Sequence, residues 1–176
     1  MMVESVEYSA EETFDGVEIR RYPRMVLATV YGLPDDDAFS ILFSYISGQN
    51  TSRRRIAMTV PVVSAERGVR IPMTAPVIAK GSSFSFVLPA EFTAETAPRP
   101  VDDRIRLEEI QQRRVAVLRF RGYTSEPKVR ERTRELMVTL GRKNLVASGE
   151  PFLMRYNPPF LPGIFRRNEI GVDLAD

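Results

Sequence analysis

The 176-residue sequence is long enough for one domain with its own hydrophobic core, and we expect a single domain over residues 1–176. It contains neither Cys nor His, which excludes disulfides, thiol nucleophiles, histidine catalysis and the common zinc sites, so no metal site is expected. The formal net charge is only +2 and the N-terminal third is acidic, which argues against nucleic-acid binding. The sequence shows no signal peptide and no run of roughly 20 apolar residues that would span a membrane, so a cytoplasmic location is expected.

The first predicted elements are a strand and an unusually apolar helix. The strand covers residues 17–31 and is broken at Tyr22-Pro23, and a helix over residues 38–46 follows three Asp residues that offer N-caps. Gly48 supplies the end of this helix. Its apolar side chains recur at helical spacing, so the helix should be buried on more than one side or line a pocket: Phe39, Leu42, Phe43 and Ile46. We expect Phe39 and Leu42 to face a sheet and Tyr45 to lie at the rim of a groove.

Two related segments of the form Met-Thr-x-Pro-Val follow the helix. They lie within residues 56–62 and 71–77, and a turn signal separates them. Because proline cannot donate a backbone hydrogen bond, strands at these segments should be edge-like or bulged at Pro61 and Pro76. A further strand is predicted over residues 84–88.

The second half of the sequence repeats the pattern of the first. Residues 17–32 align without gaps on residues 107–122, and each copy precedes a predicted helix. The second helix begins near Pro127, ends at Gly141, and is followed by strands at 152–156 and 170–174. We therefore expect an α+β fold built from a duplicated β-α-β-β unit, with halves at 17–90 and 107–174. Two helices should pack on a twisted, mostly antiparallel sheet or open barrel.

Several ordered motifs resemble the SOUL, or haem-binding protein, family over nearly the whole chain. They include Val-Glu-Ile-Arg-Arg-Tyr-Pro from residue 17, the paired Met-Thr-x-Pro-Val segments, and Phe-Arg-Arg-Asn-Glu-Ile from residue 165. The doubled Met-Thr-x-Pro-Val is similar to the prokaryotic branch. The resemblance implies two β-α-β-β halves, a hydrophobic groove beside the first helix, and binding of haem or another tetrapyrrole. It also implies kinship with effector-binding domains of some bacterial transcription regulators.

A haem site would need an apolar slot, cations for the propionates and, usually, an axial ligand. The slot that the sequence offers is the helix face with Phe39, Leu42, Phe43, Tyr45 and Ile46. The cations would be Arg53, Arg54 and Arg55, which are otherwise ordinary solvated loop charges. With no His, the iron would be left with Met58, Met73 or Tyr45, although Met more often fills gaps in a core.

The loop 157–165 is stiffened by three prolines and is unusually apolar, with Phe160, Leu161 and Phe165 among its residues. We expect these side chains to fold back onto the first helix and close the groove. The alternatives are a lid over a ligand and a contact surface for a partner chain or a membrane surface. In the motif that follows, Glu169 is predicted to pair with an Arg of a neighbouring strand while Asn168 holds a turn.

The sequence therefore favours a non-enzymatic protein that binds a hydrophobic small molecule, with a tetrapyrrole as the ligand that the family resemblance implies. Two alternatives stay open: an effector-type domain for other flat hydrophobic ligands, and a protein-interaction module that uses residues 160–165. A hydrolase has no nucleophile constellation in this sequence. The sequence does not predict an oligomeric state.

Overall fold

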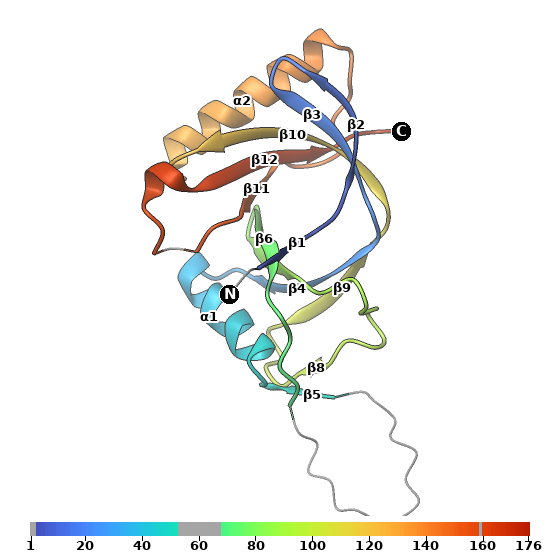
Figure 1. Cartoon of the computed structure of the whole chain (residues 1–176), viewed down its shortest axis with the longest axis vertical. Coiled ribbons are helices and arrows are strands. Elements are labelled where there is room, and N and C mark those ends of the chain that lie inside the picture. Colours follow the sequence, from blue (N-terminus) through green and yellow to red (C-terminus); the bar gives the residue numbers. More distant parts are fainter. Residues whose placement is uncertain (1–2, 53–67, 159) are drawn as a thin grey trace, which may run out of the picture.

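The computed structural model describes residues 3–52, 68–158 and 160–176. Within these residues, the helices α1 (Asp35–Ile46) and α2 (Glu126–Arg142) lie on the outer side of a curled sheet (Figure 1). The strands are β1 (Glu4–Ser5), β2 (Ser9–Phe14), β3 (Val17–Tyr22), β4 (Met25–Tyr31), β5 (Asn50–Thr51), β6 (Thr74–Lys80), β7 (Ser83–Val87), β8 (Arg99–Pro100), β9 (Arg106–Ile110), β10 (Arg113–Arg121), β11 (Phe152–Arg155) and β12 (Arg167–Asp173). A short 3-10 helix spans Gly163–Phe165.

The main sheet is antiparallel almost throughout. Its strand order is β2-β3-β10-β12-β11-β6-β7-β4-β9, and β1 adds the one parallel pairing among the described strands, against β6. The sheet curls into a half-barrel, with α1 against β4 and β7 and α2 against β10 and β12. The predicted α+β class, with two helices on a mostly antiparallel curled sheet, is confirmed.

The consecutive strands β3 and β4 pair along their length with the consecutive strands β10 and β9. Val17–Tyr22 pairs with residues 113–118, and residues 25–29 pair with Arg106–Ile110, in one continuous antiparallel register. With the 90-residue offset of the sequence alignment, four pairs of the first stretch, from Val17–Leu118 to Arg20–Val115, correspond to four pairs of the second, from Ala28–Leu107 to Met25–Ile110. That residues 17–90 and 107–174 superpose as repeats stays a prediction.

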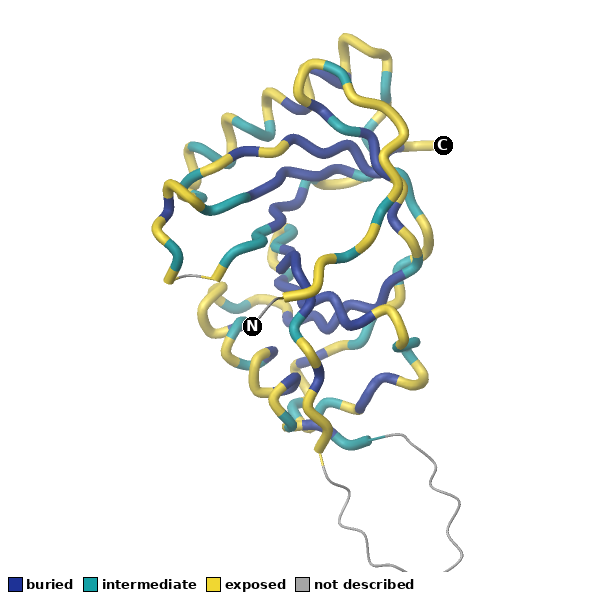
Figure 2. Tube along the Cα trace, viewed as in Figure 1, coloured by how far each residue is buried: buried dark blue, intermediate teal, exposed yellow. Residues whose placement is uncertain are grey.

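Side chains alternate between the two faces of the sheet, as they must in a strand. Along β4, Val26, Ala28 and Val30 pack with α1 in one apolar cluster, whereas Met25 and Leu27 belong to a second cluster inside the curl. A third cluster lies under α2. Figure 2 shows the buried strands between exposed outer faces of the helices. The interior of the curl is therefore a separate environment from the face that carries α1.

Three local predictions need correction or qualification. The helix α1 begins at Asp35 rather than residue 38, with Pro34 as N-cap, so the three Asp residues lie in its first turn, where the helix dipole favours negative charge. The strand β6 is internal, yet its pairing with β7 shifts register between Thr74 and Val77, which confirms the bulge expected at Pro76. The segment around Pro61 lies outside the described residues. No helix of the described part is both long and apolar enough to cross a membrane.

Candidate functional site

The helix α1 directs its apolar side chains partly into the core and partly to the surface. Leu42 and Ile46 are buried against the sheet, and the ring of Phe39 meets that of Phe86 edge-on with 5.3 Å between centroids. Phe39 and Leu42 therefore face the sheet, as predicted. Phe43 stacks on Phe39 at 5.9 Å but remains 48% exposed. The Phe39–Phe43 pair thus forms an aromatic path from the core to the surface.

Tyr45 does not lie at a groove rim, and the prediction that its hydroxyl is wet is wrong. The side chain is completely buried, and its hydroxyl donates a 2.7 Å hydrogen bond to the carbonyl oxygen of Pro98. The segment that includes the buried Ala97 covers this part of the helix, and a buried hydroxyl requires a partner. Met73 is half-buried against the same cluster. Arg53, Arg54, Arg55 and Met58 lie outside the described residues.

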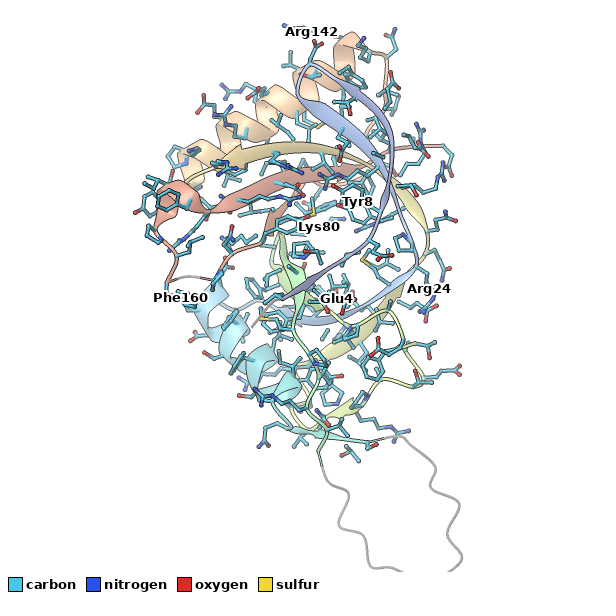
Figure 3. All side chains as sticks on the ribbon, in the orientation of Figure 1. Glu4, Tyr8, Arg24, Lys80, Arg142 and Phe160 are labelled. Carbon is cyan, nitrogen blue, oxygen red and sulfur yellow. The ribbon has the colours of Figure 1, made fainter. Side chains whose placement is uncertain are left out.

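The apolar loop, residues 160–165, points its large side chains into solvent. Phe160 is 87% exposed, Ile164 66% and Phe165 57%, while Leu161 is half-buried. The prediction that these side chains fold back onto the first helix is therefore wrong. Figure 3 shows Phe160 on the side of the molecule where α1 begins.

The backbone of the apolar loop is anchored to the segment that follows β10. Gly163 is buried against Tyr123 so closely that an added Cβ would lie 2.2 Å from the tyrosine ring. The Nε of Arg166 donates to the carbonyl oxygen of Leu161 at 2.8 Å, and the amide of Phe165 donates to the Pro162 carbonyl at 2.9 Å. These contacts hold the backbone of the loop in place and leave its large apolar side chains exposed to solvent.

Arg155, at the end of β11, connects this loop region to both helices. Its Nη1 lies 2.9 Å from Oδ2 of Asp35 in the first turn of α1, and its Nε donates to Oγ1 of Thr124, just before α2, at 3.4 Å. The start of α1 and the start of the loop are thereby held on one side of the protein. The structure thus brings the predicted helix and the predicted loop to the same region, although the loop does not cover the helix.

Glu169 lies at the centre of a buried ionic cluster inside the curl. Its carboxylate accepts a bidentate pair of hydrogen bonds from Arg20 at 2.8 and 2.9 Å, and further ones from Arg167 at 2.8 Å and from the Tyr156 hydroxyl at 2.6 Å. Both Glu169 and Arg20 are essentially unexposed. The prediction that Glu169 pairs with an Arg is confirmed. Arg119 on the adjacent β10 is a longer contact at 3.4 Å, whereas Arg20 lies on β3, two strands away.

This cluster sets the protonation state of its members. Burial alone opposes ionisation of Glu169, but its hydrogen bonds and the charge of Arg20 prevail and lower the pKa of Glu169 to about 2. Burial, together with the charge of Glu169, raises the pKa of Tyr156. Asn168, next along the strand, donates to the carbonyl oxygen of Gly122 at 2.8 Å and so holds the turn after β10, as predicted.

Sequence reasoning predicted an arginine partner for Glu169 without identifying Arg20, and it missed the tyrosines of this cluster. Glu18, Arg20 and Tyr22 alternate along β3, so their side chains share one face, and Glu18 contacts Arg20 while Tyr22 accepts from it at 2.9 Å. Tyr8 adds its ring under the Arg20 guanidinium, 4.0 Å from ring centroid to Cζ. The alternation of charged and aromatic residues along β3 was the sequence pattern that could have predicted these partners.

The fold places this protein in the α+β class, with two helices on a curled, mostly antiparallel sheet. The sequence matches the family described as SOUL heme-binding protein over residues 3–173, and the chain belongs to that family. It is 31% identical to Heme-binding protein 1 of Sus scrofa over 134 residues, which cover 76% of this chain and 68% of that protein. It is 29% identical to Heme-binding protein 2 of Homo sapiens over 160 residues, 87% of this chain and 75% of that protein.

Solved structures with little sequence similarity share the fold. The C-terminal domain of EcmrR matches with a TM-score of 0.59 at 10% identity, covering 96% of this chain and 98% of that chain. A hydrolase from Listeria innocua matches with a TM-score of 0.55 at 13% identity, covering 89% of this chain and 91% of that chain. At such identities the likeness concerns the fold alone.

Proposed function

We propose that this protein binds haem or another tetrapyrrole without catalysing a reaction, and that the apolar loop and the exposed side of α1 form the contact surface. The observation that carries the proposal is the outward presentation of Phe160, Ile164 and Phe165 on a loop whose backbone is fixed. Large apolar side chains grouped on a surface mark a binding site more often than chance. Membership of the SOUL family and the names of the two similar proteins support a tetrapyrrole as the ligand.

The residues at this surface fit the macrocycle better than they fit the iron. Aromatic side chains, including Phe43, suit the flat apolar faces, and Arg155, which is half-buried and paired with Asp35, would have to share its charge with a propionate. Arg53, Arg54 and Arg55 remain proposed partners for the propionates. The chain has no His or Cys for the iron, and the Tyr45 hydroxyl is buried on the Pro98 carbonyl. Hydrophobic contact and arginine–propionate pairing should therefore supply the binding energy.

Iron-free porphyrin should bind with nearly the same affinity as hemin, because the protein has no histidine to coordinate the iron. Parallel absorbance titrations of protein with hemin and with protoporphyrin measure this directly. A low-spin spectrum typical of two nitrogen ligands, from pure protein, would contradict the proposal that the macrocycle rather than the metal is recognised.

Replacing Phe160 and Phe165 together with Ser should weaken porphyrin binding by about tenfold or more, because two exposed rings lose their contact with the ligand. The melting temperature should stay nearly unchanged, because both side chains already lie in solvent. The matched control replaces the exposed Val138 and Val146 with Ser, which should alter neither property.

The same double replacement separates tetrapyrrole binding from the protein-interaction alternative. If porphyrin affinity is unchanged while sedimentation shows loss of self-association, the apolar loop is a protein contact surface. A large fall in melting temperature would instead mean that the two rings are part of the core, which would contradict the exposure seen in the structure.

A further inference from the structure

A cavity of about 370 Å³ lies on the concave side of the half-barrel. Its lining comes from β4, β6, β7, β9, β10 and β11 together with their turns, so no single sequence motif reveals it. Ligand pockets range over roughly 300–1,000 Å³, which makes this one suited to a ligand of one or two rings rather than to a tetrapyrrole. The helix α1 packs on the opposite face of β4 and β7, so the cavity is separate from the proposed tetrapyrrole surface.

The walls of the cavity are apolar on one side and carry hydroxyl groups on the other. Phe152 and Ile78 contribute apolar surface and belong to the cluster inside the curl. On the neighbouring strands, the buried hydroxyls of Thr29 and Ser85 hydrogen-bond to each other at 2.8 Å. A ligand with an apolar ring and a polar end matches this division.

The charges around the cavity select the sign of that polar end. Both cations in the lining are already directed at Asp173, with Arg113 at 3.1 Å and Lys80 at 3.9 Å (Figure 3 labels Lys80 inside the curl). The lining carboxylates Glu108 and Glu150 have no ion-pair partner among residues 3–52, 68–158 and 160–176.

At the rim, the Tyr31 hydroxyl donates to Glu108. The Arg106 guanidinium lies over the Tyr31 ring, with 5.7 Å between Cζ and the ring centroid. The cavity lining and Asp173 together carry three carboxylates against the two cations Arg113 and Lys80, so one negative charge is in excess and a positive ligand is favoured.

We propose that the cavity binds a small organic ammonium whose ring packs near Phe152 and whose charge is held by Glu108 and Glu150. This is a second ligand site that does not depend on tetrapyrrole binding. The hydroxyl pair of Thr29 and Ser85 supplies both a donor and an acceptor beside the ring. The ammonium of such a ligand would pair with carboxylates that have no cation partner among the described residues; Glu108 is half-buried and Glu150 is exposed.

Three indole compounds with the same two-carbon side chain test the proposed charge: tryptamine, tryptophol and indolepropionate carry a positive, a neutral and a negative end. Their fluorescence can be excited selectively, because the protein contains no Trp. Tryptamine should bind about tenfold more tightly than tryptophol, and indolepropionate most weakly. Preference for indolepropionate, or no binding of any probe at millimolar concentration, would overturn the proposal.

Variants locate the site. Glu108→Gln keeps the shape of the side chain and the hydrogen bond from Tyr31 but removes the negative charge. The affinity for tryptamine should therefore fall by about tenfold, and the affinity for tryptophol should stay unchanged. Glu131→Gln, on the exposed side of α2, is the matched control and should change nothing. Ser83→Phe fills the cavity and should abolish binding of all three probes in a protein that keeps its melting temperature.

If Glu108→Gln and a folded Ser83→Phe both bind tryptamine normally, the probe occupies another site and the proposal fails. The Phe160/Phe165 double Ser variant should bind tryptamine with unchanged affinity, which distinguishes this cavity from the apolar loop.

Discussion

Replacing Glu169 with Gln should lower the free energy of unfolding by about 3–5 kcal/mol, because it leaves Arg20 charged, buried and without its bidentate partner. The Tyr156 hydroxyl and Arg167 would also lose a charged acceptor. Urea denaturation at neutral pH, followed by far-ultraviolet circular dichroism, measures the change. The control is Glu135→Gln, which removes an exposed α2 ion pair to Arg132 and should cost less than about 1 kcal/mol. Equal effects of the two replacements would contradict the central role of the buried cluster.

The same carboxylate gives a pH dependence with a defined sign. The pKa of Glu169 is about 2 in the folded protein against an ordinary 4.5, so the folded state favours the ionised form. Its contribution to stability is fully present above pH 4.5 and is lost as the pH falls toward 2, by about 3 kcal/mol in total. In Glu169→Gln this component should be absent, so the stability gap between the two proteins should narrow in acid. A gap that stays constant over this range would show that folding does not lower the pKa of Glu169.

The elements of the fold were largely predictable because they depend on local patterns. Alternation along residues 17–31 and 113–121, and helical spacing at Leu42 and Ile46, carry the information within one segment. The pairing of Glu169 with an arginine was also predictable, because a charged residue in a buried strand needs a partner. That the partner is Arg20, two strands away, depends on how the sheet curls, which no local pattern specifies.

The candidate sites were harder to predict, because their character depends on what covers each residue. Tyr45 has the spacing of a rim residue, yet the distant Pro98 segment covers it and accepts its hydroxyl. The loop with Phe160 has the composition of a core element, but the contact of Gly163 with Tyr123 holds its backbone so that the side chains face outward. The cavity beside Phe152 is assembled from strands that only the finished sheet brings together.

Two adjacent positions in α1 should lose different amounts of stability on replacement by alanine, and together they test how the helix divides between core and ligand surface. Leu42→Ala should cost about 2–5 kcal/mol of unfolding free energy, because Leu42 is fully buried against the sheet and its loss leaves a cavity. Phe43→Ala should cost about 1 kcal/mol or less, because Phe43 is half in solvent and loses mainly its stacking on Phe39.

Porphyrin titration of the same two variants completes the test. Phe43→Ala should weaken binding, because it removes an exposed ring from the proposed surface, whereas Leu42→Ala should affect affinity only as far as it destabilises the protein. Unchanged affinity in Phe43→Ala, combined with weakened affinity in the Phe160/Phe165 double Ser variant, would confine the tetrapyrrole contact to the apolar loop. A stability loss in Phe43→Ala as large as that in Leu42→Ala would mean that Phe43 is covered in solution. The aromatic path from Phe39 to the surface would then belong to the core.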